Sequence, residues 1–240
     1  MCAARLLVIQ HIPDDHLNEL AGPLMDAGLV IETWFTPARA APVRGIADYD
    51  GLLLLGAHAG VNDEADHPWM SAERKIVERA MTAQIPTLGL CFGAQLLASI
   101  GGAQVLHEDS QEAGWTRVRM DPAAADDPVL GALGPAPLVF AHHHDTFTPP
   151  PAGAVLGRSD RANQVLRIGS STWGMQFHIE VSPGAILSWL AMFEEDIHSH
   201  AVDPAALVAE TALRWRDYRT LGAHVAQSFG QVIAAHGALR

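Results

Sequence analysis

The chain has 240 residues, of which 49% are hydrophobic and 18% are charged, and its formal charge is −12 with histidines neutral. This composition excludes a disordered protein and provides for one sizeable core, so we expect a single domain over residues 1–240. The acidic balance and the lack of a Lys/Arg cluster argue against a nucleic-acid partner.

Cellular compartment is suggested by the cysteines and the apolar runs. Two cysteines, Cys2 and Cys91, are too few for a disulfide framework. The N-terminal ten residues indicate a first strand rather than a signal peptide, since they lack a small-residue cleavage site. The apolar runs break well before the ~18 residues that a membrane span needs. We therefore expect a cytoplasmic protein with no membrane partner.

Short apolar runs alternate with longer amphipathic segments in the first hundred residues. The runs predict buried strands at Arg5–Gln10, Val30–Phe35, Leu52–Leu55 and Thr87–Leu90. The segments between them predict helices at His16–Ala27, Trp69–Gln84 and Gly93–Ile100, the first capped by Asp14-Asp15. This alternation is typical of an α/β protein whose mostly parallel sheet is covered on both faces.

The pattern changes after Ala103, where short runs are punctuated by Gly and Pro. They predict antiparallel strands that extend the sheet, at Val118–Met120, Leu138–Ala141, Ala154–Gly157, Val165–Ile168 and Trp173–Phe177. Ser182-Pro183 and Asp203-Pro204 each combine an N-cap with a proline at the first helical position. We expect one helix to about Ile197 and a C-terminal helical extension from about residue 204, running from Ala205 to about Ala235.

The segment Gly89-Leu90-Cys91-Phe92-Gly93 carries the strongest chemical signal. A predicted strand runs straight into a predicted helix with a cysteine at the turn, which is the pattern of a nucleophile elbow. The helix N-terminus favours the Cys91 thiolate, and the Phe92 N–H points where an oxyanion would form. The alternative is a buried cysteine that only packs after the strand, and the flanking glycines favour the nucleophile.

A thiol nucleophile needs a base and a group that orients the base. His178 and Glu180 follow the last predicted strand, and at a strand end they would share a face because side chains alternate with period two. Taken alone, a His-x-Glu pair is more often a surface pair than a catalytic one. Its weight comes from its presence in the same chain as the elbow.

Together the two segments resemble the class I (triad) glutamine amidotransferases, and most closely the free-standing members and the amidotransferase part of GMP synthase. The matching positions are Gly89, Cys91, Gly93, Gln95, His178 and Glu180. The resemblance implies a flavodoxin-like three-layer sandwich, no cofactor, and L-glutamine or a γ-glutamyl compound as substrate. A separate synthetase subunit would then use the ammonia, because nothing in this chain resembles an ATP-binding domain.

The resemblance also implies roles for individual residues. Cys91 would attack the side-chain amide of glutamine, His178 would transfer protons, and Glu180 would orient His178. Ammonia and a γ-glutamyl thioester would form, and water would hydrolyse the thioester to glutamate. Gln95 and the run His142-His143-His144-Asp145 would line the substrate pocket.

Two positions depart from the family pattern. Relatives carry Gly-Gly-Pro after the third strand, where this chain has Gly56-Ala57-His58. We expect Ala57, with Phe92, to supply the oxyanion-hole N–H groups, and Gly56 to line the substrate site, although alanine reaches positive φ less cheaply than glycine. His144 replaces the usual glycine of the second loop. Both departures bear on the substrate more than on the nucleophile.

Consecutive histidines at 142–144 also suggest a metal site. On a strand, neighbouring side chains point to opposite faces, so at most His142 and His144 could converge. We therefore expect no metal, and we expect His143 to be a structural partner of the active-site loop. The locally basic stretch Arg214–Arg219 is either a solvated helix face or a docking surface for a partner.

Three functions remain open from the sequence. The first is a glutamine-hydrolysing amidotransferase. The second is a γ-glutamyl peptide hydrolase that uses the same triad. The third is a catalytically weak binding or regulatory module, against which the intact Cys91, His178 and Glu180 argue.

Overall fold

The computed structural model describes residues 3–13, 15–192 and 203–239. The strands are β1 (Arg5–Gln10), β2 (Val30–Phe35), β3 (Gly51–Leu54), β4 (Thr87–Leu90), β5 (Val105–Arg117), β6 (Arg119–Met120), β7 (Leu138–Phe147), β8 (Gly153–Arg158), β9 (Asn163–Ile168) and β10 (Thr172–Met175). The α-helices are α1 (Ala21–Asp26), α2 (Trp69–Thr82), α3 (Phe92–Ile100), α4 (Pro183–Met192) and α6 (Pro204–Ala238). No helix in the described ranges is long and apolar enough to cross a membrane.

The central sheet has eight strands in the order β2-β1-β3-β4-β10-β9-β8-β6. Its first five strands pair in parallel, and β9, β8 and β6 continue it in antiparallel fashion. Strands β5 and β7 form a separate antiparallel pair. The expected α/β class, with a mostly parallel sheet and an antiparallel extension, is confirmed.

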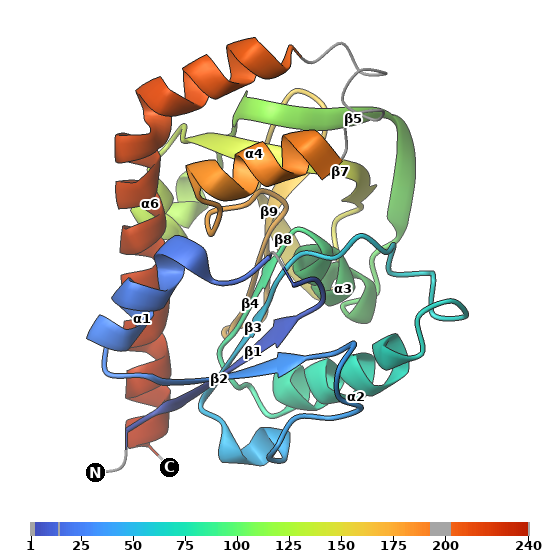
Figure 1. Ribbon diagram of the computed structural model, residues 1–240. Helices are drawn as coiled ribbons and strands as arrows, with labels where there is room; N and C mark the ends of the chain where they lie inside the picture. The colour runs from blue at the N-terminus through green and yellow to red at the C-terminus, as the bar shows by residue number, and fades with distance from the viewer. Residues whose placement is uncertain (1–2, 14, 193–202, 240) are drawn as a thin grey trace.

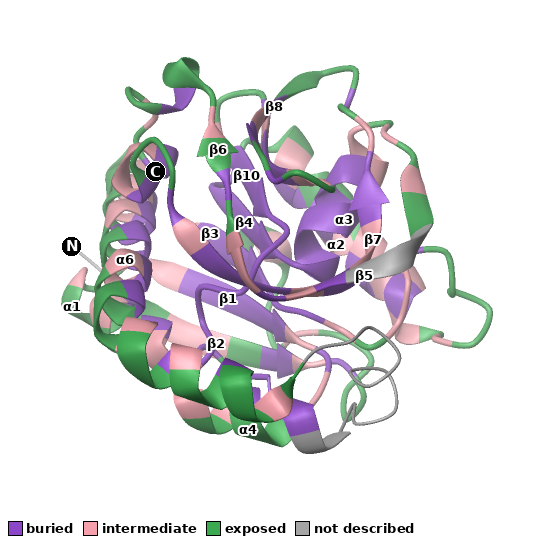
Figure 2. Ribbon diagram, turned by 90° about the horizontal axis from the view of Figure 1, so that it is seen from above, coloured by how far each residue is buried: buried purple, intermediate pink, exposed green. Residues whose placement is uncertain are grey.

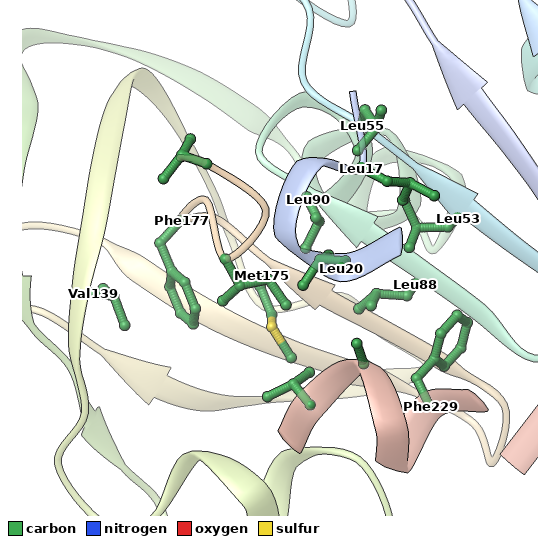
Figure 3. Packing of buried hydrophobic residues seen from close by; sticks show 14 of the residues in the cluster. Leu17, Leu20, Leu53, Leu55, Leu88, Leu90, Val139, Met175, Phe177 and Phe229 are labelled. Atoms are coloured by element: carbon green, nitrogen blue, oxygen red, sulfur yellow. The ribbon is translucent and has the colours of Figure 1, made fainter. Parts of the chain in front are cut away.

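Both faces of β1, β3 and β4 are buried, which explains their continuous apolar sequences. In β1, Leu6 and Val8 face one hydrophobic core, and Leu7 and Ile9 face another. Figure 1 shows α1 and α6 on one side of the sheet and α2 and α3 on the other, and the buried strands lie between these layers in Figure 2. In the first core, Phe229 of α6 packs near the sheet residues (Figure 3).

The carboxyl ends of β1, β3, β4 and β10 meet at one edge of the sheet, because these four strands are parallel neighbours. Open α/β sheets bind their ligands at this edge. The segments that follow these strands contain the candidate residues: Asp15, Gly56-Ala57, Cys91 and His178–Glu180.

The helix expected at His16–Ala27 is shorter than predicted. A 3-10 turn at Asn18–Leu20 precedes α1, which begins only at Ala21. Gly22 and Pro23 reduce the helix propensity of this segment. Asp15 does not cap the helix, because its side chain is buried without a hydrogen bond, and Asp14 lies outside the described residues.

The middle of the chain also differs from expectation. Strand β5 was not predicted, because its polar sequence lacks a clear alternation. Its pairing with β7 carries that strand beyond Ala141 to Phe147, so the run His142–Asp145 lies in a strand and not in a loop. Strand β10 ends at Met175, two residues before the predicted end.

The C-terminal helices follow their predicted caps. The Asp203 carboxylate accepts hydrogen bonds from the N–H groups of Ala205 and Ala206, and α6 continues three residues past Ala235. The predicted end of the preceding helix, Ile197, lies outside the described residues.

Candidate active site

Cys91 lies at the sharp turn between β4 and α3. Its backbone has φ 50° and ψ −109°, a strained conformation for a residue other than glycine. Two backbone hydrogen bonds hold it there: its N–H donates to the Met175 carbonyl at 2.8 Å, and its carbonyl accepts from the Gln95 N–H at 3.1 Å. The thiol thus stands at the N-terminus of α3, as expected for a nucleophile elbow.

The two flanking glycines permit close packing around this turn. A Cβ at Gly89 would lie 2.4 Å from the Gly93 carbonyl carbon, and a Cβ at Gly93 would lie 2.7 Å from the Leu54 carbonyl oxygen. Neither glycine has positive φ, so the reason for glycine is lack of space and not conformational freedom. The strain of the elbow is confined to Cys91.

His178 and Glu180 form a buried pair beside the thiol. Nδ1 of His178 lies 2.5 Å from Oε1 of Glu180, and both side chains are almost fully buried. Burial alone would lower the pKa of His178, but the charges of Glu180 and Cys91 and hydrogen bonds to both raise it well above its usual value. The protonated form of the ring is therefore favoured beside the carboxylate and the sulfur.

The expected geometry of this pair was wrong in one respect. The sequence argument required a strand, but both residues follow β10 in a bent segment. The segment is fixed by other contacts: the His178 N–H donates to the Phe140 carbonyl at 2.9 Å. The Tyr218 hydroxyl of α6 donates to the His178 carbonyl at 2.6 Å and accepts from the Phe140 N–H at 3.2 Å. The ring of Trp189, from α4, packs edge-to-face on His178 with centroids 4.7 Å apart.

Two buried amides lie on the other side of the thiol. Gln176 donates from Nε2 to the Cys91 sulfur at 3.8 Å. Gln95 donates from Nε2 to the Gln176 side-chain oxygen and to the Asp145 carbonyl, each at 3.3 Å. These bonds connect α3, β7 and the segment after β10 around the sulfur.

A buried histidine supports the loop after β3. His11 Nδ1 lies 2.9 Å from the Gly56 carbonyl oxygen, and its Nε2 lies 3.0 Å from the Glu73 carboxylate of α2. Burial opposes a charge on His11, but Glu73 and then the Gly56 carbonyl more than compensate, so the pKa of His11 is raised. Ala57 has no positive φ, so the replacement of the family's glycine brings no strain.

A cavity of about 540 Å³ opens beside Cys91. Its lining includes these candidates: Ala57, Phe92, Gln95, His142, His143, His144 and Asp145. Gly56 is the exception, because it lines a second, smaller cavity of about 40 Å³ beside Asp15 and His178. His58 also lines both cavities, and burial lowers its pKa.

The sequence around this site matches a known family. The glutamine amidotransferase class-I family matches residues 24–193, a range that contains the elbow and the His178–Glu180 pair. The chain belongs to this class I glutamine amidotransferase family.

The chain is similar in sequence to several named enzymes. The chain is 34% identical over 134 residues to the glutamine-hydrolysing GMP synthase of Porphyromonas gingivalis, across 55% of this chain and 25% of that enzyme. It is 29% identical to one subunit of the glutamine-hydrolysing GMP synthase of Sulfurisphaera tokodaii, across 58% of this chain and 72% of that protein. It is 26% identical to a γ-glutamyl-L-1-hydroxyisopropylamide hydrolase of a Pseudomonas species, across 56% of this chain and 48% of that protein. The chain thus matches only a quarter of the first of these relatives.

The class I amidotransferase fold extends over almost the whole chain. A glutamine amidotransferase from Thermotoga maritima superimposes with a TM-score of 0.86 over 96% of this chain and 100% of its own, at 24% identity. This similarity supports the flavodoxin-like three-layer arrangement.

The amidotransferase pocket wall has a polar support that the sequence did not suggest. Glu112 of β5 accepts hydrogen bonds from Thr116, Ser159 and Gln164 at 2.7–3.0 Å. Burial would raise the pKa of Glu112, but His143 and the hydroxyl donors lower it. His143 is also bonded through Nδ1 to the Asp145 carbonyl at 3.0 Å. This network fixes the strand that faces Cys91.

Three other site residues of the amidotransferase were missed in the sequence: His11, Asp15 and Tyr218. His11 directly follows β1 and Asp15 lies in the segment after it, and the carboxyl end of a parallel strand is a signal that could have found both. Tyr218 offered no such signal, because it lies in the middle of a long helix.

Proposed function

We propose that this protein hydrolyses the side-chain amide of glutamine through a thioester at Cys91. One observation carries the proposal: a strained cysteine at a helix N-terminus lies beside a buried His178–Glu180 pair. A thiolate paired with an imidazolium is a nucleophile that carries its own proton donor.

In the first half-reaction the Cys91 thiolate attacks the amide carbon of the substrate. The developing oxyanion is stabilised by the N–H groups of Ala57 and Phe92, which both line the pocket. The His178 imidazolium gives its proton to the departing nitrogen, so ammonia leaves and the thioester remains. Glu180 holds the tautomer and orientation of the ring throughout.

In the second half-reaction a water molecule attacks the thioester carbon. Neutral His178 accepts a proton from this water, the C–S bond breaks, and glutamate leaves with the thiolate restored. Gln95, Asp145 and the histidines at 142–144 form the wall against which the amino-acid end of the substrate binds.

The ammonia would serve a separate synthetase subunit. The relative from Sulfurisphaera tokodaii is named as one subunit of a GMP synthase, which supports a partner chain of this kind.

A second candidate is the hydrolysis of other γ-glutamyl amides. The relative from Pseudomonas is named for such a substrate, and a cavity of about 540 Å³ is within the roughly 300–1,000 Å³ of sites for larger ligands.

Release of ammonia and glutamate tests the proposal, with glutamine and a panel of γ-glutamyl amides and peptides as substrates. We expect glutamine turnover by the wild type and its loss in Cys91→Ala and His178→Ala. Turnover of the panel with little glutamine turnover would favour the second candidate. If there is no turnover and a glutamine-like diazo ketone does not alkylate Cys91, the chain is a binding or regulatory module and the proposal is wrong.

A further inference from the structure

Asp15 is a buried acid that the triad chemistry does not use. Its side chain is 1% exposed, and neither carboxylate oxygen has a hydrogen-bond partner. A buried carboxylate without partners is costly, so such a group needs a reason.

Asp15 lies next to the catalytic pair. One carboxylate oxygen of Asp15, one of Glu180 and a ring nitrogen of His178 lie within 4.8 Å of one another. Gly56 makes room for this approach, since a Cβ there would lie 2.7 Å from an Asp15 oxygen and 3.2 Å from Cε1 of His178. A side chain at position 56 would separate the two groups.

A cavity of about 40 Å³ adjoins these groups, with Asp15, Gly56, Cys91, His178 and Trp189 in its lining. A cavity of only ~10–15 Å³ can hold one water. It is large enough for water or ammonia and far too small for a peptide. The two cavities adjoin at Cys91, because Ala57, His58, Cys91 and His142 line both, whereas Asp15, His178 and Trp189 line only the smaller one.

We propose that this small cavity is the chamber that receives the leaving ammonia and then holds the attacking water, with Asp15 as the hydrogen-bond acceptor that orients both. The inference rests on the proposed function and deepens it. Ammonia and water both present hydrogens to a carboxylate. Asp15 is a catalytic residue in this scheme because it contacts the attacking water.

The water must direct two hydrogens to acceptors and one of its lone pairs to the thioester carbon. One O–H donates to Asp15, the other donates to Nε2 of neutral His178, and the lone pair faces the thioester carbon. The O–C bond forms as His178 takes its proton. The C–S bond then breaks, and the sulfur leaves as the thiolate beside the new imidazolium. The product acid loses its proton to solvent.

The charged surroundings make Asp15 sensitive to pH near neutrality. Burial and the Glu180 carboxylate raise the pKa of Asp15 to about 7, against the opposing charges of His178 and His11. The carboxylate form, which accepts the hydrogen bond, is therefore lost as the pH falls through about 7. On the side of α2, the Glu73 carboxylate lies 3.0 Å from Nε2 of His11 and offsets the positive charge of that ring.

The test separates the two half-reactions in wild type, Asp15→Ala, Asp15→Asn and the control Asp26→Asn, which removes an exposed acid from α1. Glutamine is mixed rapidly with each protein, and the thioester fraction is measured by intact mass after an acid quench. The rate of Cys91 alkylation by a glutamine-like diazo ketone reports attack by the thiolate without any water step.

In Asp15→Ala we expect ammonia turnover to fall by about tenfold to a hundredfold, which is the effect of a misplaced reactant. The thioester should accumulate, and alkylation should stay near the wild-type rate. Added hydroxylamine should restore turnover, because it attacks the thioester in place of water and releases the hydroxamate. Asp15→Asn retains an accepting oxygen, so it should recover part of the rate and lose the decline below about pH 7.

If Asp15→Ala releases ammonia at the wild-type rate, the chamber proposal is wrong and the proposed function stands. An equal fall in alkylation and turnover, without accumulated thioester, would also overturn it, because Asp15 would then only support the structure. A wild type that forms neither thioester nor ammonia would overturn the proposed function as well.

Discussion

Nδ1 of His11 lies 2.9 Å from the Gly56 carbonyl oxygen, which can only accept, and Nε2 lies 3.0 Å from the Glu73 carboxylate. Nδ1 therefore carries a hydrogen, and the raised pKa of His11 beside Glu73 favours a second hydrogen on Nε2. The Gly56 carbonyl and the Ala57 N–H belong to one planar trans peptide and point in opposite directions. His11 therefore sets the direction of the Ala57 N–H, the candidate oxyanion donor.

Replacement of His11 tests this arrangement. We expect His11→Ala to lower kcat for ammonia release by about tenfold to a hundredfold, somewhat below the roughly 10²–10³ lost with a whole oxyanion donor. His11→Asn places an amide N–H near the Nδ1 position and should retain more activity. Both variants leave Glu73 without its partner, so their difference in kcat isolates the bond to Gly56. Equal kcat values would contradict the assignment.

Tyr218 supports the backbone of His178, and Tyr218→Phe removes that support. The carbonyl of His178 and the N–H of Phe140 would then be buried without partners, at a cost of about 1–3 kcal/mol in the free energy of unfolding. We expect kcat to fall together with the urea midpoint. Tyr49→Phe is the control, because Tyr49 donates to Glu32 at 2.6 Å far from Cys91. It should lose stability and retain kcat, and a comparable loss of kcat in the control would refute the claim.

Glu180→Gln should change the pH profile as well as the rate. Burial opposes the charge on His178, and without the Glu180 carboxylate its pKa should fall. The imidazolium that protonates the leaving nitrogen would then be lost at a lower pH. We expect the alkaline limb of kcat/KM to move to lower pH, with Glu78→Gln, an exposed acid, as the control. An unmoved alkaline limb would show that Glu180 does not set the protonation of His178.

Replacement of a glycine beside Cys91 should lower the stability of the protein. Gly93→Ala would place its Cβ 2.7 Å from both the Cβ and the carbonyl oxygen of Leu54. Overpacking of this kind costs about 1–3 kcal/mol, so the urea midpoint should fall. Gly22→Ala meets nothing within 4 Å and lies in α1, where alanine is favoured by roughly 0.5–1 kcal/mol. A Gly93→Ala protein as stable as wild type would mean that the elbow backbone can shift.

Local sequence signals were sufficient for most of the parallel half of the fold and for the sharp turn at Cys91. Continuous apolar runs marked β1, β3 and β4, and the turn at Cys91 was evident within a few residues of sequence. These features depend on neighbours along the chain, so periodicity and glycine spacing reveal them.

The remaining site residues depend on contacts between distant segments. Asp15 has the pattern of a helix cap, yet the fold directs it to His178 because the helix begins later and Gly56 leaves space. His178 and Glu180 meet as expected, but the segment after β10 is shaped by Phe140 and not by strand alternation. No local pattern encodes such contacts.

Helix α6 has a consequence for the order in which the site is completed. Tyr218 comes 40 residues after His178, and Gly222 lets the helix approach the Ile179 carbonyl, where a Cβ would lie 2.8 Å away. During synthesis the ribosome therefore produces the thiol, the imidazole and both carboxylates before the phenol that anchors the His178 backbone. A nascent chain therefore carries Cys91, His178 and Glu180 before it carries the helix that holds the backbone of His178 in place.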